Sequence, residues 1–350
     1  MGQEAPYSPA HSHFKVHLMI WFLEGQASQR DIIKGAIEAL PDAVRVYASH
    51  RRDRPEITSA AHVSFVEPME ASERVSWVIH TALQHTIKVV VAGRVGGEYE
   101  ARRAQFQDAG ITLVTGGTSC RTFELVDDKA RFTAEAERVG LPCIPALTVS
   151  NAEQLRAAYE AFSSRGEVCI KPVVGIYGQG FWRFKADTDP FRCFENPDAR
   201  QVDFETYLRI FGAAPGRQPM LVMPYLPGSE CSVDMVCEAG KVVAYVGRRK
   251  SDVHQTFERG SAATDLAIAA AEHFGCDGIV NVQTRDDAEG HPRLLEINPR
   301  YSGGIGYTRE TGVNLAGIFA TRRLGFAEPA RQWIDGVRIK AITVAVSILS

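Results

Sequence analysis

The first half of the chain alternates apolar strands with amphipathic helices, and this order limits the folds open to it. Apolar, β-rich runs recur between segments that repeat apolar residues every third or fourth position. The predicted strands are 15–22, 44–48, 62–66, 89–93 and 111–114, and the predicted helices are 29–40, 72–85 and 98–109. A β-α-β-α order predicts a parallel, doubly wound sheet.

Composition and charge exclude several classes of protein. The chain has 350 residues, 45% of them hydrophobic, which predicts two or three folded domains. Its formal net charge is −3, so we expect no nucleic-acid partner. No apolar run approaches the ~20 residues that span a bilayer, so we expect no membrane partner. Seven scattered cysteines without a CxxC pair indicate reduced thiols and a cytoplasmic location. Residues 1–13 are polar, and we expect a flexible leader there.

Glycines follow the predicted strand 89–93 and raise the question of dinucleotide binding. Gly93, Gly96 and Gly97 stand between a strand and a helix, but their GxxGG spacing is not the Rossmann fingerprint. A tight connection is the more common reason for such glycines. Crevices at this edge of a sheet do hold ligands, so a substrate contact is the better expectation.

The second half of the chain has a different pattern, with helices separated by pairs of strands. Short turns such as 238–241 and 286–290 join strands that we expect to be antiparallel. The predicted helices are 128–138, 152–163 and 262–274, and the predicted strands are 168–172, 220–224, 232–237, 242–246, 278–284 and 293–298. This is a mixed α+β layout.

A lysine stands at the end of the apolar strand 168–172, just before a glycine-rich loop. Burying the ammonium of Lys171 requires a nearby anion. The glycines Gly175, Gly178 and Gly180 let backbone N–H groups close over phosphate oxygens. The lysine precedes the glycines, so this is not a Walker A loop. In isolation, a strand edge with a flexible loop explains the pattern equally well.

Two further segments have features of a nucleotide site. Strand 220–224 leads into an irregular stretch that can offer an unpaired C=O and N–H to a base, and Glu230 can accept from sugar hydroxyls. A cationic cluster, Arg248-Arg249-Lys250, ends the strand that begins at 242. Each segment has a simpler explanation. The first can be a turn with a surface glutamate, and the second can be a run of solvated charges.

Oxygen-bearing side chains occur on the last two predicted strands. Residues two apart on a strand face the same way, so Gln283, Glu296 and Asn298 can converge. Amide and carboxylate oxygens suit Mg²⁺, which takes few protein carboxylates and completes its shell with substrate phosphates. Arg300 adds a planar fork for an anion.

The order of these motifs resembles the ATP-grasp superfamily. The matching segments are Asp128-Lys129-Ala-Arg-Phe132, Ile170-Lys171-Pro172, Tyr225-Leu226-Pro-Gly-Ser-Glu230-Cys-Ser-Val-Asp234 and Leu294-Leu-Glu296-Ile-Asn298-Pro-Arg300. The resemblance implies an α/β chain with a parallel, Rossmann-like pre-grasp domain at 14–120 and an ATP-grasp domain at 121–326. It implies a mobile lid at about 148–220, and it leaves 327–350 as a C-terminal extension.

The resemblance also implies a role for each matching residue. Lys129 and Lys171 would contact the α- and β-phosphates of ATP under the glycine loop. In the hinge around Tyr225, the C=O of Pro224 and the N–H of Leu226 would bind adenine, and Glu230 would hold the ribose. A set of three, Gln283, Glu296 and Asn298, would hold Mg²⁺, with Mn²⁺ as an alternative. Arg300 would stabilise the transferred phosphoryl group.

These roles predict an ATP-dependent carboxylate–amine ligase that acts through an acylphosphate. Its partners would be a small carboxylate and an amine, and the resemblance admits a homodimer. We expect the acceptor to enter between the two domains, near Arg249, Arg300 and 301–304. The form Asn281-Val-Gln283 resembles the large subunit of carbamoyl phosphate synthetase, so a carboxyphosphate-forming enzyme is one alternative. A non-catalytic nucleotide-binding regulator is another, because Gln283 replaces a common acidic ligand.

Overall fold

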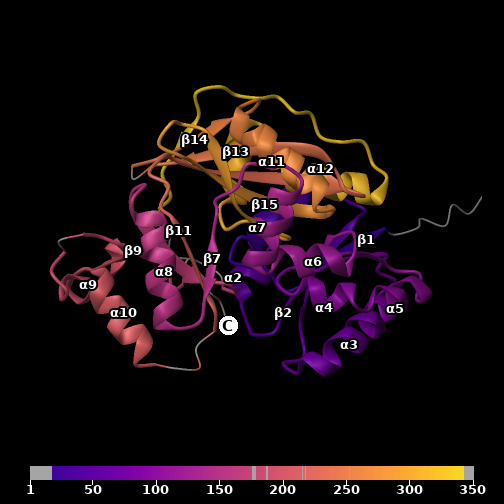
Figure 1. Ribbon diagram of the computed structural model, residues 1–350. Coiled ribbons are helices and arrows are strands. Elements are labelled where there is room, and N and C mark those ends of the chain that lie inside the picture. The colour runs from indigo at the N-terminus through magenta and orange to yellow at the C-terminus, as the bar shows by residue number, and fades with distance from the viewer. Residues whose placement is uncertain are drawn as a thin grey trace, which may run out of the picture.

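Three β-sheets organise the protein (Figure 1). The computed structural model describes residues 18–175, 179–186, 188–214, 216, 218–251 and 253–342. The leader expected at 1–13, the loop residue Gly178 and the last part of the C-terminal extension lie outside the described residues.

The first sheet is parallel, as the β-α alternation predicts. Its strand order is β3-β2-β1-β4-β5, so the chain winds first one way and then the other from the centre. The strands are β1 (Met19–Phe22), β2 (Arg45–His50), β3 (Val63–Val66), β4 (Val89–Val91) and β5 (Thr112–Val114). The helices are α1 (Gln29–Ala39), α2 (Pro55–Thr58), α3 (Ala71–Gln84), α4 (Gly96–Glu100) and α5 (Arg103–Asp108). The single helix expected at 98–109 is therefore two, since helical structure is interrupted at Ala101–Arg102.

The second sheet is mixed and forms the part of the molecule at the left of Figure 1. Its order is β10-β9-β8-β11-β7, with the strands β7 (Leu147–Val149), β8 (Val168–Pro172), β9 (Trp182–Phe184), β10 (Gln201–Val202) and β11 (Met220–Pro224). Its helices are α8 (Ala152–Ser163), α9 (Arg192–Glu195), η1 (Pro197–Ala199) and α10 (Phe204–Gly212). Phe162, Phe184, Phe204 and Phe211 fill a core of its own. This unit spans the segment where we expect a lid.

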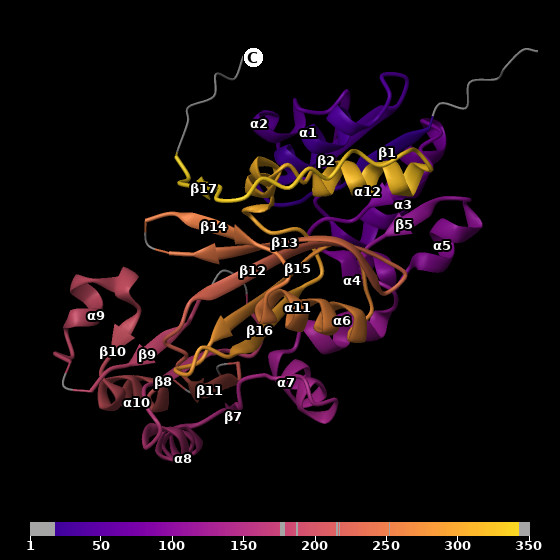
Figure 2. The same ribbon diagram turned by 90° about the horizontal axis from the view of Figure 1, so that it is seen from above.

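The third sheet is antiparallel along its main path and lies between the other two (Figure 2). Its order is β16-β15-β12-β13-β14-β17, and β6 (Gly116–Gly117) also pairs with β15. The strands are β12 (Glu230–Glu238), β13 (Lys241–Lys250), β14 (Gln255–Glu258), β15 (Cys276–Asp286), β16 (Pro292–Asn298) and β17 (Arg338–Ile339). The remaining helices are α6 (Cys120–Val126), α7 (Lys129–Arg138), α11 (Ala262–His273), η2 (Ile305–Thr311) and α12 (Leu315–Leu324).

Helices α11 and α12 cover the third sheet and join it to its neighbours. Apolar residues of α11 pack with Phe132 of α7 in one core, and a capping box at Ser261 begins α11. Helix α12 packs in another core together with β1 and α1, where Phe22 and Phe319 lie 6.4 Å apart between ring centroids. The first and third sheets thus share a hydrophobic core, which fixes their relative position. Within the described ranges, no helix is both long and apolar enough to cross a bilayer.

We predict that the contact between the first and third sheets is sensitive to Gly25. A Cβ atom at this position would lie 1.5 Å from Tyr301 Oη, so Gly25→Ala forces the loop after β1 away from the third sheet. Overpacking of this kind costs about 1–3 kcal/mol. The free energy of unfolding, measured by urea denaturation, should fall by that amount. Gly303→Ala is the control, because a Cβ there meets no atom within 4 Å. Equal stability of the two variants would contradict this prediction.

Candidate active site

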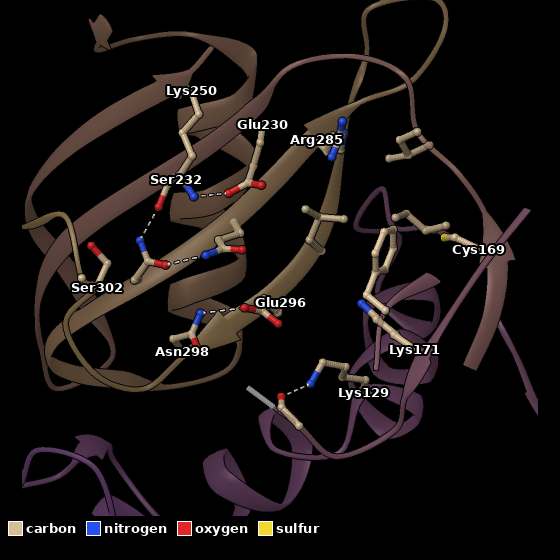
Figure 3. A pocket seen from close by; sticks show the side chains of 18 of the residues that line it. Lys129, Cys169, Lys171, Glu230, Ser232, Lys250, Arg285, Glu296, Asn298 and Ser302 are labelled. Atoms are coloured by element: carbon tan, nitrogen blue, oxygen red, sulfur yellow. Dashed lines mark hydrogen bonds and ion pairs between the residues drawn. The ribbon is translucent and has the colours of Figure 1, made fainter. Parts of the chain in front are cut away.

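A cavity of about 570 Å³, here called the main cavity, lies between the second and third sheets (Figure 3). Strands β8 and β11 of the second sheet contribute to its wall, and β12, β13, β15 and β16 face them from the third sheet. The cavity has an apolar end and a charged end. Its apolar lining consists of Ile144, Cys169, Phe181, Met223, Leu226 and Leu295.

The hinge that connects the two sheets borders the apolar end. Pro224 ends β11, and its C=O accepts a long contact from Cys169 Sγ at 3.9 Å. Two guanidinium groups contact the Tyr225 ring, with the Arg183 carbon 3.7 Å and the Arg285 carbon 5.0 Å from its centroid. Arg285 also donates to Tyr225 Oη at 2.9 Å. The hinge is therefore fixed from both sheets, beside a slot of apolar side chains that can hold a planar base.

Two lysines approach the charged end from different elements. Lys129 is the first residue of α7, whose N-cap Asp128 accepts from the N–H groups of Ala130 and Arg131. Its Nζ donates to the C=O of Gly175 at 2.9 Å. Lys171 lies on β8, and its ammonium forms no ion pair or hydrogen bond with another described residue.

Burial lowers the pKa of the Lys171 ammonium from 10.5, and the charge of Glu296 offsets part of this effect. An ammonium held in this way lacks a close anionic partner. It is suited to an anionic ligand that supplies one.

The glycine loop follows β8 at the edge of the main cavity. Gly175 lines the cavity, and Gly180 has a left-handed backbone with φ +71°. A Cβ at position 180 would also lie 2.8 Å from Pro172, so both backbone and space require glycine there.

The predicted oxygen ligands meet across the β15–β16 ladder. Gln283 pairs with Glu296, and Asn281 pairs with Asn298. The amide of Asn298 donates to Glu296 Oε1 at 3.0 Å, and Arg300 donates to Asn298 Oδ1 at 3.2 Å. The structure thus brings Gln283, Glu296, Asn298 and Arg300 together at the charged end of the main cavity.

This donor set fits Mg²⁺ in one particular way. Among the described residues, no three His, Cys, Asp or Glu side chains gather as a metal site. The set is instead one carboxylate and two amides, Glu296 with Gln283 and Asn298. Mg²⁺ commonly uses one or two protein carboxylates and takes its other oxygens from water and substrate phosphates. The residues therefore fit a metal that arrives together with a nucleotide.

The cationic cluster at the end of β13 divides between two faces of the sheet. Lys250 lines the main cavity and forms an ion pair with Glu230. Arg248 lines the cavity as well, because residues two apart on a strand share a face. Arg249, which we expected near the acceptor, points the other way. It pairs with Glu258 at 3.0 Å and with Asp286 at 2.6 Å.

Arg248 is the central residue that the motif reading missed. It is buried and donates to Asp234 at 2.8 Å, Gln255 at 2.9 Å and Ser302 at 2.8 Å. Strand alternation places Arg248 and Lys250 opposite to Arg249. This alternation can be read from the sequence, but the sequence alone does not show which face of the strand borders the cavity.

A second cavity of about 330 Å³ lies between the first and third sheets. The segment from Arg94 to Glu98, which includes the loop after β4 and the start of α4, forms one wall. Asp127, between α6 and α7, lies in another. This second cavity shares five residues with the main cavity: Lys129, Gly175, Glu296, Asn298 and Arg300. The two cavities therefore reach the same charged residues.

The matches to known proteins agree with this architecture. Residues 216–345 match the model of a family described as ATP-grasp in the biosynthetic pathway with Ter operon. The arginine-specific large chain of carbamoyl phosphate synthase from Geobacillus stearothermophilus is 27% identical over 256 residues. That match covers 69% of this chain and 22% of the relative, so the chain spans about a fifth of that protein's length.

Solved structures of low sequence identity share the fold. N5-carboxyaminoimidazole synthase from Aspergillus clavatus, in complex with ADP, has a TM-score of 0.66 at 16% identity, covering 92% of this chain and 80% of its own. L-amino acid ligase from Bacillus licheniformis has a TM-score of 0.60 at 14% identity, covering 89% and 75%.

A parallel α/β sheet, a separate mixed sheet and a central antiparallel sheet with the motifs in order define an ATP-grasp fold. Residues 216–345 match an ATP-grasp family model, and the fold resembles that of ATP-grasp enzymes, as the order of the motifs predicts. The chain is also homologous to the large chain of carbamoyl phosphate synthase.

We predict that Lys171→Met stabilises the protein while it weakens nucleotide binding. The substitution removes an ammonium without a close anion, and replacing a poorly compensated buried charge can raise stability by about 1 kcal/mol. The pKa of Lys171 in the folded protein lies below 10.5, so the unfolded chain binds more protons than the folded chain as the pH rises toward 10.5. The free energy of unfolding of the parent therefore rises over this range, and the difference in stability between Lys171→Met and the parent shrinks. Urea denaturation at several pH values measures this, with the exposed Lys34→Met as control. A less stable Lys171→Met would contradict the prediction.

Proposed function

We propose that this chain is an ATP-dependent ligase that joins a carboxylate to an amine through an acylphosphate. One observation carries the proposal: a single cavity has an apolar slot beside a hinge at one end and Lys129, Lys171, Glu296 and Arg300 at the other. Adenine would occupy the slot, with Pro224 C=O and Leu226 N–H at its edge. The phosphates would extend to the charged end, and Glu230 would hold the ribose.

The first step transfers the γ-phosphoryl group. An oxygen of the substrate carboxylate forms a bond to phosphorus, the bond from phosphorus to the β–γ bridging oxygen breaks, and ADP leaves with that electron pair. Lys129 and Lys171 hold the phosphates, and Arg300 stabilises the charge on the migrating group. The side chains of Gln283, Glu296 and Asn298 would hold Mg²⁺, which supplies charge neutralisation to the phosphates when bound.

The second step forms the new C–N bond. The neutral amine attacks the acyl carbon, and the carbon–oxygen bond to phosphate breaks. Phosphate leaves with the electron pair and takes up the proton that the nitrogen loses, as hydrogen phosphate. A carboxylate alone has no adequate leaving group, and ATP supplies one. We also propose that the second sheet acts as a lid that excludes water from this intermediate.

A second candidate function has its own support. The sequence Asn281-Val-Gln283 and the 27% identity to carbamoyl phosphate synthase favour bicarbonate as the phosphorylated acid. The same residues would then form carboxyphosphate. ADP release measured across a panel of carboxylates separates the two candidates, since bicarbonate alone should stimulate the second. Stimulation by no acid, with ATP still bound, would favour a non-catalytic regulator.

Arg300 tests the transition-state role. Arg300→Lys keeps the charge but loses the two-pronged geometry, so we expect kcat to fall about 100-fold. ATP affinity should change little, because charge accumulates on the phosphoryl group only during transfer. Steady-state ADP release with a stimulating carboxylate gives kcat, and calorimetry with a non-hydrolysable ATP analogue gives affinity. Turnover at the parent rate would show that the role of Arg300 is wrong.

Glu296 tests the dependence on metal. Glu296→Gln removes the single carboxylate of the proposed metal set and keeps its shape. We expect Mg²⁺-dependent binding of an ATP analogue to weaken about 10-fold or more, because Mg²⁺ relies on the few carboxylates that it has. The matched control is Glu289→Gln on the exposed turn between β15 and β16. If Glu296→Gln bound the ATP analogue as tightly as the parent, and a chelator did not change that affinity, the assignment of Glu296 as a metal ligand would be contradicted.

A further inference from the structure

The second cavity gives access to the reacting end of the main cavity from another side. It opens between the first and third sheets, whereas the adenine slot lies between the second and third. Both cavities end at Lys129, Glu296, Asn298 and Arg300. A ligand in the second cavity would therefore reach the phosphoryl group without passing the nucleotide.

The charged residues of the second cavity fall into two groups. Lys129, Arg300 and Glu296 also line the main cavity, where the proposed function uses them for phosphates and metal. Arg94, Glu98 and Asp127 line the second cavity and not the main one. The proposed function gives these three side chains no role with the nucleotide or the metal, and their formal charges are one positive and two negative.

Asp127 is the least engaged of the three. Its carboxylate forms no hydrogen bond or ion pair with another described residue. Desolvation raises the pKa of this carboxyl, and the charges of Lys129 and Arg300 lower it in part, so all three groups lie within electrostatic reach. A carboxylate at this place can bind a cation next to the transferred phosphoryl group.

Arg94 lies in the loop after β4, and Glu98 lies in the helix α4 that follows it. The N–H of Arg94 donates to the C=O of Glu24 at 2.9 Å, and a Cβ on Gly93 would lie 2.1 Å from that same oxygen. The guanidinium of Arg94 lies 3.5 Å from Glu24, a long contact for an ion pair, and Glu98 is 3.2 Å from Arg74. The backbone that carries Arg94 is therefore fixed against the loop after β1, and the segment presents one cation and one anion to the second cavity.

We propose that the second cavity binds the amine substrate, and that this substrate is an amino acid. Asp127 binds its ammonium group beside Arg300, and Arg94 binds its carboxylate at the other wall. The inference rests on the proposed ligase function and names its nucleophile. A cavity of about 330 Å³ suits a compact molecule. A phosphorylated amine would require a surplus of cations, which Glu98 and Asp127 remove.

The bound ammonium becomes the nucleophile by losing one proton to Asp127 or to water. The free amine then attacks the acyl carbon, the bond from carbon to phosphate oxygen breaks, and phosphate accepts the second proton. Asp127 thus holds the nitrogen on the side of the phosphoryl group that the nucleotide does not occupy.

The experiment separates this inference from the proposed function. Acylphosphate formation is first measured by trapping with hydroxylamine, which carries no charge near neutral pH and does not depend on an ammonium site. The parent and Asp127→Asn should form hydroxamate at equal rates. The KM for glycine or L-alanine as nucleophile should rise 10- to 100-fold in Asp127→Asn, as expected for a lost charged hydrogen bond. Glu124→Gln removes a carboxylate one helical turn earlier, outside the second cavity, and should match the parent.

Arg94 distinguishes an amino acid from a simple amine. Arg94→Gln should raise the KM for glycine or L-alanine and leave the KM for methylamine unchanged. An unchanged KM for these amino acids in Asp127→Asn would overturn the inference, and so would methylamine as effective as glycine in the parent. A parent that forms no hydroxamate would contradict the proposed function instead.

A binding measurement tests the site without turnover. Calorimetric titration of the standard amino acids, with a non-hydrolysable ATP analogue and Mg²⁺ present, should detect one that binds the parent and binds Asp127→Asn at least 10-fold more weakly. The absence of binding by any of them would overturn the inference.

Discussion

The antiparallel register of β15 with its neighbours is the constraint on which the site depends. Gln283 opposes Glu296 and Asn281 opposes Asn298, so one ladder gathers the oxygen-bearing side chains. A slip of one residue would move one strand's side chains to the opposite face. Strand β12 pairs with β15 over eight positions and fixes the same register from its other edge. The irregularity in the β15–β16 ladder falls after Gln283, so both pairs that gather the oxygen-bearing side chains lie in the regular part of the ladder.

A buried polar network behind this ladder extends the constraint toward the first sheet. Asn281 donates to Asp234 at 3.0 Å, Asp234 accepts from Arg248, and Arg248 donates to Ser302. Ser302 in turn accepts through its C=O from the hydroxyl of Ser28 at 2.9 Å, in the loop after β1. Loss of one partner from a buried ion pair costs several kcal/mol, because the other charge stays buried. The network therefore couples the floor of the main cavity to the position of the first sheet.

Local sequence patterns predicted the helices and strands better than they predicted which side of each strand faces the cavity. Strand and helix alternation predicted the parallel sheet, and motif order predicted the ATP-grasp fold. The break near Ala101 is not visible in periodicity, because the residues around it (Glu98, Glu100, Arg102 and Arg103) are charged and form no apolar pattern. Arg249 was placed near the acceptor because a charge cluster does not say which side of β13 faces the cavity. That choice depends on pairing with β12 and β14, distant in sequence from the cluster. The partners of Arg248 come from three separate segments, so no local pattern contains them.

The connection between the first and third sheets also positions the segment around Arg300. Gly116 has φ +106°, and a Cβ there would lie 1.8 Å from the C=O of Pro299. Its strand β6 pairs with the start of β15, so the linker from the first sheet is held against both β15 and the residue before Arg300. The same segment, 298–300, lines both cavities. Under the proposed roles, the Arg300 guanidinium would reach a phosphoryl group from one cavity and border a nucleophile in the other, and such a group tolerates little displacement. In the proposed reaction, the first sheet would therefore contribute to the catalytic geometry, because its linker is held against the backbone from which Arg300 projects.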